Sequence, residues 1–170
     1  MINKLAEKRA QSARLVLGID PGGEVTGFGV LRKLGASCQM VACGANRAKR
    51  GETLTAKLAR IFHFVQDVIE QYQPEEMAVE DIFYGRNAQS MKAIGQVRGV
   101  IILAGALAEL PVFEYAPREV KLAVAGNGNA SKEQVQRMTQ AVLSLAAPPK
   151  PHDAADALAI ALCHTHRHPR

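Results

Sequence analysis

The architecture of this chain is set by one short stretch, Leu15-Val16-Leu17-Gly18-Ile19-Asp20-Pro21-Gly22-Gly23. Its first residues are apolar without polar alternation, as expected for a strand that is buried on both faces. The proline and the glycines end the strand, so Asp20 stands at its carboxyl end. Ligands of open α/β sheets bind at that edge. The stretch therefore predicts an α/β fold with Asp20 at the functional edge of its sheet.

A second strand of the same kind lies at Met77-Ala78-Val79 and leads into Glu80-Asp81. The helix that precedes it stops at Gln73-Pro74. A helix between two strands predicts a crossover that makes the strands parallel. Glu80 is therefore expected at the same edge as Asp20. Asp81 points to the other side of its strand and is left out of the site.

The remaining pattern predicts a five-stranded mixed sheet flanked by helices. Two strands follow the first in close succession, which indicates an antiparallel meander. Apolar residues at helical spacing predict the helices, and Ser131 with Gln134 matches a capping box. The further expected elements are strands near residues 27–31, 39–43 and 112–115, and helices over residues 54–72, 87–109, 117–124, from 131 onward and 152–166.

The last of these helices carries Asp153 and Asp156 in its first turn. The two residues are spaced i,i+3, so both side chains project from one face. Asp153 follows a proline-rich stretch and is equally suited to cap the helix, and Asp156 would favour its positive end. A ligand role and a helix-end role both stay open. His152 is a candidate ligand or proton carrier, with a surface histidine as the alternative.

The four carboxylates of Asp20, Glu80, Asp153 and Asp156 predict a metal site. Crowded carboxylates repel one another and take up protons unless a cation intervenes. Oxygen-only ligands favour hard ions such as Mg²⁺ or Mn²⁺. Two such ions, roughly 3.5–4 Å apart, can activate a water and stabilise the leaving oxygen of a phosphodiester. The expected chemistry is phosphodiester hydrolysis.

An ordered set of motifs extends from about Arg14 to His164. Its members are Gly18-Ile19-Asp20-Pro21-Gly22, Thr26-Gly27-Phe28-Gly29-Val30, Val79-Glu80-Asp81-Ile82-Phe83, Gly95-Gln96-Val97-Arg98-Gly99-Val100, Leu110-Pro111-Val112-Phe113-Glu114-Tyr115, the segment from Lys121 to Lys132, and Asp153-Ala154-Ala155-Asp156-Ala157-Leu158-Ala159. This set resembles the RuvC family of Holliday junction resolvases. The chain departs from the family in having about a dozen extra residues before the first strand and in ending soon after the last helix.

The resemblance implies an RNase H-like fold and a homodimer. It implies an endodeoxyribonuclease dependent on Mg²⁺ or Mn²⁺, with two ions per site, that cuts four-way DNA junctions by paired nicks and leaves 5′-phosphates, in recombination and repair. It also places the first and fourth strands side by side. Alanines at positions 154, 155, 157 and 159 then let the last helix approach the sheet. Docking of the branch-migration complex is a further partner that the resemblance leaves open.

Four more residues become DNA-binding candidates through the resemblance. Phe83 matches an aromatic that faces the crossover, where unstacked bases are available, although a core position is the alternative. Arg86 follows shortly after it. Lys121 and Lys132 match positions that reach the scissile backbone, where a lysine supplies charge stabilisation. Solvent-exposed lysines are the alternative for these two.

Size and charge fit one nuclease domain with a polyanionic partner. The chain has 170 residues, is 48% hydrophobic, and carries a net charge of +5 with a pI near 9.3. We expect a flexible basic arm over residues 1–13, an RNase H-like domain over residues 14–166 and a disordered tail over residues 167–170. We interpret His164, His166 and His168 as part of a frayed tail end of the chain rather than as a metal site. A second basic cluster comprises Arg47, Lys49, Arg50, Lys57 and Arg60, of which about half fit ordinary surface charge equally well.

The three cysteines show neither zinc-ligand spacing nor an even count, which argues against a zinc site and a disulfide framework. With no apolar run long enough to span a bilayer, the protein is expected in the cytoplasm. Two other function classes fit parts of the sequence. A fragment of an actin-like nucleotide-binding domain would share the Gly-Ile-Asp opening but would need a second matching half. A non-catalytic nucleic-acid-binding domain would leave the four carboxylates without a role.

Overall fold

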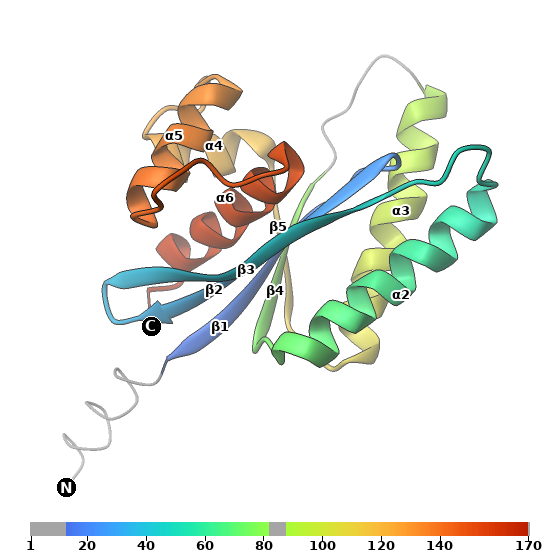
Figure 1. Cartoon of the computed structure of the whole chain (residues 1–170), viewed down its shortest axis with the longest axis horizontal. Coiled ribbons are helices and arrows are strands. Elements are labelled where there is room, and N and C mark those ends of the chain that lie inside the picture. The colour runs from blue at the N-terminus through green and yellow to red at the C-terminus, as the bar shows by residue number, and fades with distance from the viewer. Residues whose placement is uncertain (1–12, 82–87, 170) are drawn as a thin grey trace, which may run out of the picture.

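The sheet has five strands in the order β3-β2-β1-β4-β5 (Figure 1). The computed structural model describes residues 13–81 and 88–169, with the backbone alone for residues 88–90. Strands β1 (Arg14–Asp20), β2 (Val25–Leu34) and β3 (Ser37–Arg47) form the antiparallel meander. Strands β4 (Glu76–Glu80) and β5 (Val112–Tyr115) run parallel to β1. The predicted mixed sheet is therefore confirmed, with β4 next to β1.

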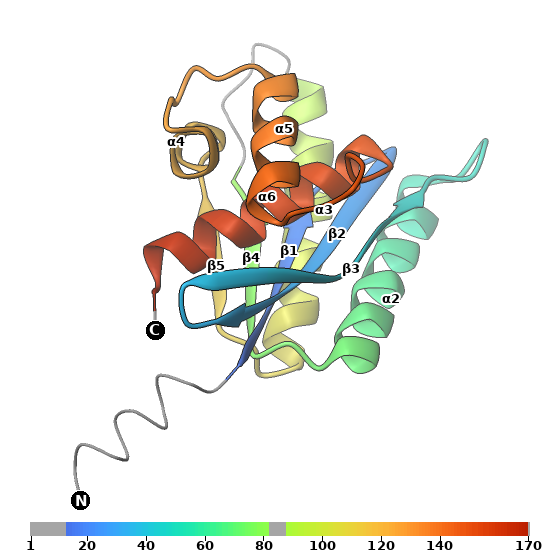
Figure 2. The same cartoon turned by 60° about the vertical axis from the view of Figure 1, so that its left-hand side comes forward.

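Helices cover both faces of the sheet (Figures 1 and 2). One face packs against α2 (Leu54–Tyr72) and α3 (Ala88–Leu107). The other packs against α6 (His152–Arg167), with α4 (Pro117–Ala125) and α5 (Lys132–Val142) beside it. Side chains of β1 alternate between these layers, since Val16 belongs to the second core and Leu17 to the first. No helix in the described ranges is long and apolar enough to cross a membrane.

Helix α6 lies against the strands at backbone contact distance. A Cβ atom placed on Gly18 or on Gly27 would lie 2.1 Å from the carbonyl oxygens of Ala157 and Asp153, respectively. Gly29, two residues further along β2, contacts the same helix at Leu158. The alanines of α6 were expected to allow this approach, and the strand glycines are the other half of the contact. Because both surfaces lack side-chain bulk, the acidic start of α6 is brought down to the sheet.

The start of α6 differs from the cap that the sequence suggested. Pro151 is the N-cap residue, and its carbonyl oxygen accepts bonds from the amides of Ala154 and Ala155. Asp153 is the second residue inside the helix, so its reading as an N-cap is wrong. Its charge still lies in the first turn, where the helix dipole favours an anion. By contrast, the capping box predicted at Ser131 is present at the start of α5.

The assignment of His164 to a tail is also wrong. This side chain is fully buried between α6 and the sheet, at the end far from Asp20. Its Nδ1 lies 2.7 Å from the hydroxyl of Tyr115, and its Nε2 lies 2.6 Å from a carboxylate oxygen of Glu76. Arg14 pairs with the same carboxylate and donates to the backbone carbonyl of His168. The last helix is therefore fastened to the sheet up to residue 168.

Candidate active site

Two carboxylates stand at the ends of adjacent parallel strands. Asp20 ends β1 and Glu80 ends β4, and the ladder pairs the residues just before them, Ile19 with Val79. The apolar cores of both strands fix this register because their side chains are buried on the two faces. The sequence placed both residues at this edge, and the structure brings them together there.

Helix α6 adds Asp153 and Asp156 to the same cluster. Burial raises the pKa of Asp20 to about 7, with further increases from Glu80, Asp156 and Asp153. Burial, followed by the charge of Asp156, likewise raises the pKa of Glu80 to about 7. Each shift shows that the charged form is costly without a compensating cation. The carboxylates therefore form one electrostatic unit.

Two lysines face this unit across a pocket of about 260 Å³. Lys121 comes from α4 and Lys132 from α5, and the pocket is also lined by Glu80 and Asp156. The Nζ atom of Lys132 lies 2.5 Å from Oδ2 of Asp156, and this hydrogen bond raises the pKa of the lysine. The side chains predicted to assist with charge thus lie where the carboxylates converge.

The carboxylates are near one another without forming a closed ligand set. Among residues 13–81 and 88–169, no three histidine, cysteine or acidic side chains are arranged to hold a metal ion. The donor set nevertheless fits a hard divalent cation, because it consists of carboxylate oxygens whose pKa values are raised by burial and by the neighbouring carboxylates. Lys132 provides the positive charge at Asp156 in the arrangement described.

The other candidates fall in different places. Phe83 and Arg86 lie outside the described residues. His152, the first residue of α6, is exposed, and its Nδ1 lies 3.0 Å from the side-chain nitrogen of Gln136. Asp81 is turned away from the cluster toward Arg98, whose guanidinium lies 3.1 Å from it. Its exclusion from the metal site agrees with this contact.

Arg98 is a structural residue whose role sequence reasoning missed. It projects from α3 and pairs both with Asp81, directly after the catalytic candidate Glu80, and with Glu114 of β5. Its side chain is 18% exposed. The signal in the sequence was a charge within a long apolar helix. Arg98 fastens α3 to the strand that carries Glu80.

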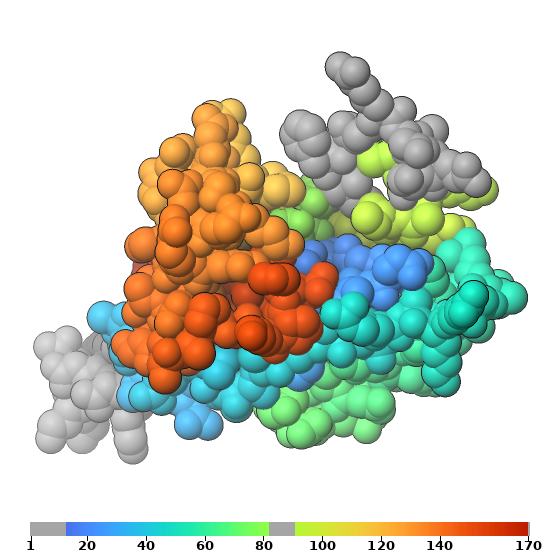
Figure 3. Space-filling model, turned by 45° about the horizontal axis from the view of Figure 1, so that its top comes forward, coloured from blue at the N-terminus to red at the C-terminus, as the bar shows by residue number. Residues whose placement is uncertain are grey.

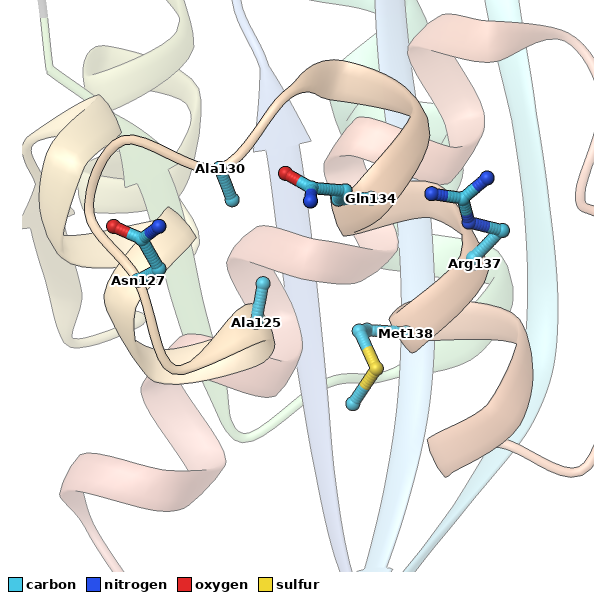
Figure 4. A pocket seen from close by; sticks show the side chains of 6 residues that line it. All are labelled: Ala125, Asn127, Ala130, Gln134, Arg137 and Met138. Atoms are coloured by element: carbon cyan, nitrogen blue, oxygen red, sulfur yellow. The ribbon is translucent and has the colours of Figure 1, made fainter.

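A second hollow, of about 210 Å³, lies between the end of α4 and α5 (Figure 4). Its described lining contains amides and an arginine but no acidic residue. The oxygens of both amides are used to order the chain, because Asn127 accepts from the amide of Asn129 and Gln134 accepts from that of Ser131. This hollow is separate from the carboxylate cluster.

The sheet order, with carboxylates at two strand ends and at the start of the covering helix, defines a nuclease of the RNase H-like class. Known structures support the fold. The yeast mitochondrial Holliday junction resolvase superposes with a TM-score of 0.66 at 11% identity, over 99% of this chain and 88% of that one. The structure described as T. thermophilus RuvC in complex with Holliday junction substrate superposes with a TM-score of 0.86 at 35% identity, over 92% and 95% of the two chains.

The sequence comparison identifies the family. The family described as "Crossover junction endodeoxyribonuclease RuvC" matches residues 16–164. The protein of that name from Moorella thermoacetica is 49% identical over 150 residues, covering 88% of this chain and 90% of the relative. The one from Psychromonas ingrahamii is 46% identical over 152 residues, covering 89% and 87%. The chain belongs to the RuvC family of crossover junction endodeoxyribonucleases, which confirms the resemblance found in its motifs.

Proposed function

We propose that this protein resolves four-way DNA junctions by paired, symmetric nicks that leave 5′-phosphate and 3′-hydroxyl ends, in homologous recombination and DNA repair. The observation that carries the proposal is the half-buried pair of Asp20 and Glu80, whose pKa values are both raised to about 7 beside the acidic start of α6. In a member of this family, such a cluster suits cation-assisted cleavage of a phosphodiester.

The proposed metal ligands are Asp20, Glu80, Asp153 and Asp156. Two bound Mg²⁺ or Mn²⁺ ions would supply an activated water and charge stabilisation for the leaving oxygen. The chain's own contribution is to hold the ligands on rigid elements, since two stand on a buried ladder and two on a helix packed at backbone contact.

Lys121 and Lys132 are proposed to stabilise negative charge on that phosphate. Both line the pocket that Glu80 and Asp156 share. Fixed cations near the position where charge develops lower the barrier because they need no rearrangement during the reaction. The ion pair with Asp156 keeps Lys132 within reach of the site. Phe83 and Arg86 are proposed to contact DNA near the crossover.

We propose a homodimer that joins through α3. A symmetric junction cut at paired positions needs two equivalent sites, which a two-fold dimer provides. The outer face of α3 is apolar, with Leu103 50% and Leu107 64% exposed. Gly99 on the same helix has no atom within 4 Å of the place where a Cβ would lie, which leaves room for a partner helix. Docking of the branch-migration complex and action in the cytoplasm, beside chromosomal DNA, complete the proposal.

The decisive experiment incubates the protein with a synthetic four-way junction and a matched linear duplex, with and without Mn²⁺. We expect metal-dependent nicking of the junction alone. Asp20→Asn and Glu80→Gln should abolish nicking yet keep junction binding, because affinity comes mainly from cationic contacts with phosphates. Asp67→Asn, on the exposed surface of α2, is the matched control and should nick normally. A wild-type protein that binds but never nicks would favour the non-catalytic alternative.

A further inference from the structure

A group of three cations stands at the same end of the sheet as the carboxylates. Arg47 ends β3, and Lys49 and Arg50 follow in the connection to α2. We call Arg47, Lys49 and Arg50 the β3–α2 shoulder. All three side chains are exposed, and within the described residues none of them makes an ion pair or side-chain hydrogen bond.

The acids nearest to the shoulder are already neutralised by other cations. Glu24 pairs with Lys57 at 2.6 Å. Glu52 receives two hydrogen bonds from Arg60, at 3.0 and 3.1 Å, which lower the pKa of its carboxyl. The basic cluster seen in the sequence therefore divides into two classes. Lys57 and Arg60 are structural, and the three shoulder cations keep their full charge for an external partner.

The shoulder is held in a defined conformation. The amide of Ala48 donates to the carbonyl of Glu24 at 2.8 Å, which ties the connection to the β1–β2 turn. The amide of Glu52 closes a turn onto the carbonyl of Lys49, with Gly51 at a φ of 74°. Helix α2 then begins at its N-cap Thr53 and carries no acidic residue in its first turn. The positive end of the helix dipole thus adds to the charge of the shoulder.

The ladder gives the distance from the shoulder to the cleavage site. Asp20 pairs with Gly27, Gly27 with Ala45, and Arg47 lies two residues beyond Ala45. With strands about 4.8 Å apart and about 3.4 Å per residue, the Cα atoms of Asp20 and Arg47 are about 12 Å apart. Duplex DNA carries one phosphate per about 1.7 Å of its axis, so a distance of about 12 Å spans several phosphates. One duplex arm can therefore reach both the shoulder and the cleavage site within a single helical turn.

The shoulder and the lysine pair flank the site. In Figure 3 the turn after β1 lies between the α5–α6 layer and the β3–α2 connection. We infer that Arg47, Lys49 and Arg50 bind backbone phosphates of the duplex arm that leads into the scissile position. Resting on the proposed function, this inference gives the protein a second cationic support for its substrate, on the side of the site opposite to Lys121 and Lys132. The shoulder holds the arm and takes no part in the chemistry.

The test measures junction binding without metal over a series of KCl concentrations. The variant Arg47→Gln/Lys49→Gln/Arg50→Gln should reduce the magnitude of the slope of log K against log[salt] by about 2–3. It should also weaken binding at least tenfold at about 0.1 M salt. The variant Arg47→Lys/Arg50→Lys keeps the charge and should bind as the wild type does. Arg32→Gln, an exposed arginine at the other end of β2, should leave affinity and slope unchanged.

Two results would overturn the inference. One is a triple variant with the salt slope of the wild type. The other is a loss in Arg32→Gln as large per charge as in the triple variant, which would make the effect one of net charge. The proposed function fails separately, since a wild type that never nicks can still show the shoulder's effect on binding. A wild type that nicks while the triple variant keeps its slope removes only the shoulder.

Discussion

Replacing Gly18 by alanine should disturb the active site without touching any of its reacting groups. The new Cβ would lie 2.1 Å from the carbonyl oxygen of Ala157 and 2.8 Å from the amide nitrogen of Ala161, both of them backbone atoms of α6. Ordinary contact begins at 3.4 Å, so helix and strand must separate by about 1.3 Å. Overpacking of this kind destabilises by about 1–3 kcal/mol.

The same shift should lower the nicking rate by more than the loss of unfolding free energy alone would explain. Asp153 and Asp156 stand on α6, so they would move relative to Asp20 on β1. A misplacement of about 1 Å can reduce a rate on the order of 100-fold. Urea unfolding gives the stability change, and single-turnover nicking of a four-way junction at saturating enzyme gives the rate.

Gly23→Ala is the matched control for this experiment. It makes the same substitution in the following turn, where nothing lies within 4 Å of the new Cβ. It should unfold and nick as the wild type does. Wild-type stability in Gly18→Ala would refute this prediction. It is refuted equally if stability falls but the nicking rate stays normal, because the seating of α6 would then not set the geometry of the carboxylates.

Asp153→Ala should lose nicking with no capping penalty, and thermal melting should stay close to that of Asp153→Asn, because Pro151 occupies the cap position; a loss of about 1 kcal/mol confined to the alanine variant would restore the cap reading. Burial lowers the pKa of His164, so the unfolded chain takes up a proton near pH 6.5 that the folded chain resists, and stability should fall as the pH drops below about 6.5. His164→Gln should flatten that dependence in urea titrations at pH 7 and at lower pH, and an unchanged slope would exclude His164 as its source. Leu103→Lys with Leu107→Lys should convert a dimer into a monomer by light scattering while melting hardly changes, since both side chains are at least half exposed; a persistent dimer would move the interface away from α3.

The strands could be predicted because burial on two faces leaves a strong local pattern, whereas the placing of β1 beside β4 came from the resemblance to the RuvC family. The unalternated stretch before Asp20 and the one before Glu80 are each short, apolar and ended by polar or turn residues. The crossover helix between them makes them parallel whatever the details of packing. These local features were enough to place the two carboxylates at one edge of the sheet.

Features that depend on contacts distant in sequence were missed. Nothing local indicates that Gly18 meets Ala157, because the contact joins residues at the two ends of the chain. His164 stands near the C-terminus among other histidines. Only the fold shows that its ring nitrogens hydrogen-bond to Glu76 and Tyr115. The start of α6 was predicted correctly at residue 152, but its N-cap was assigned to Asp153 because aspartate is a preferred capping residue, whereas Pro151 holds that position.

The ion pairs of Arg98 with Asp81 and Glu114 have a consequence for the coordination of the two cuts. In the proposed dimer, α3 touches the partner, and Arg98 fixes that helix to Asp81 and Glu114 at the ends of the two strands beside the site. The surface that meets the other subunit and the strand that carries Glu80 are therefore parts of one rigid body. The distance between the two cleavage centres is then fixed by the dimer. A junction must match that distance before either strand is cut.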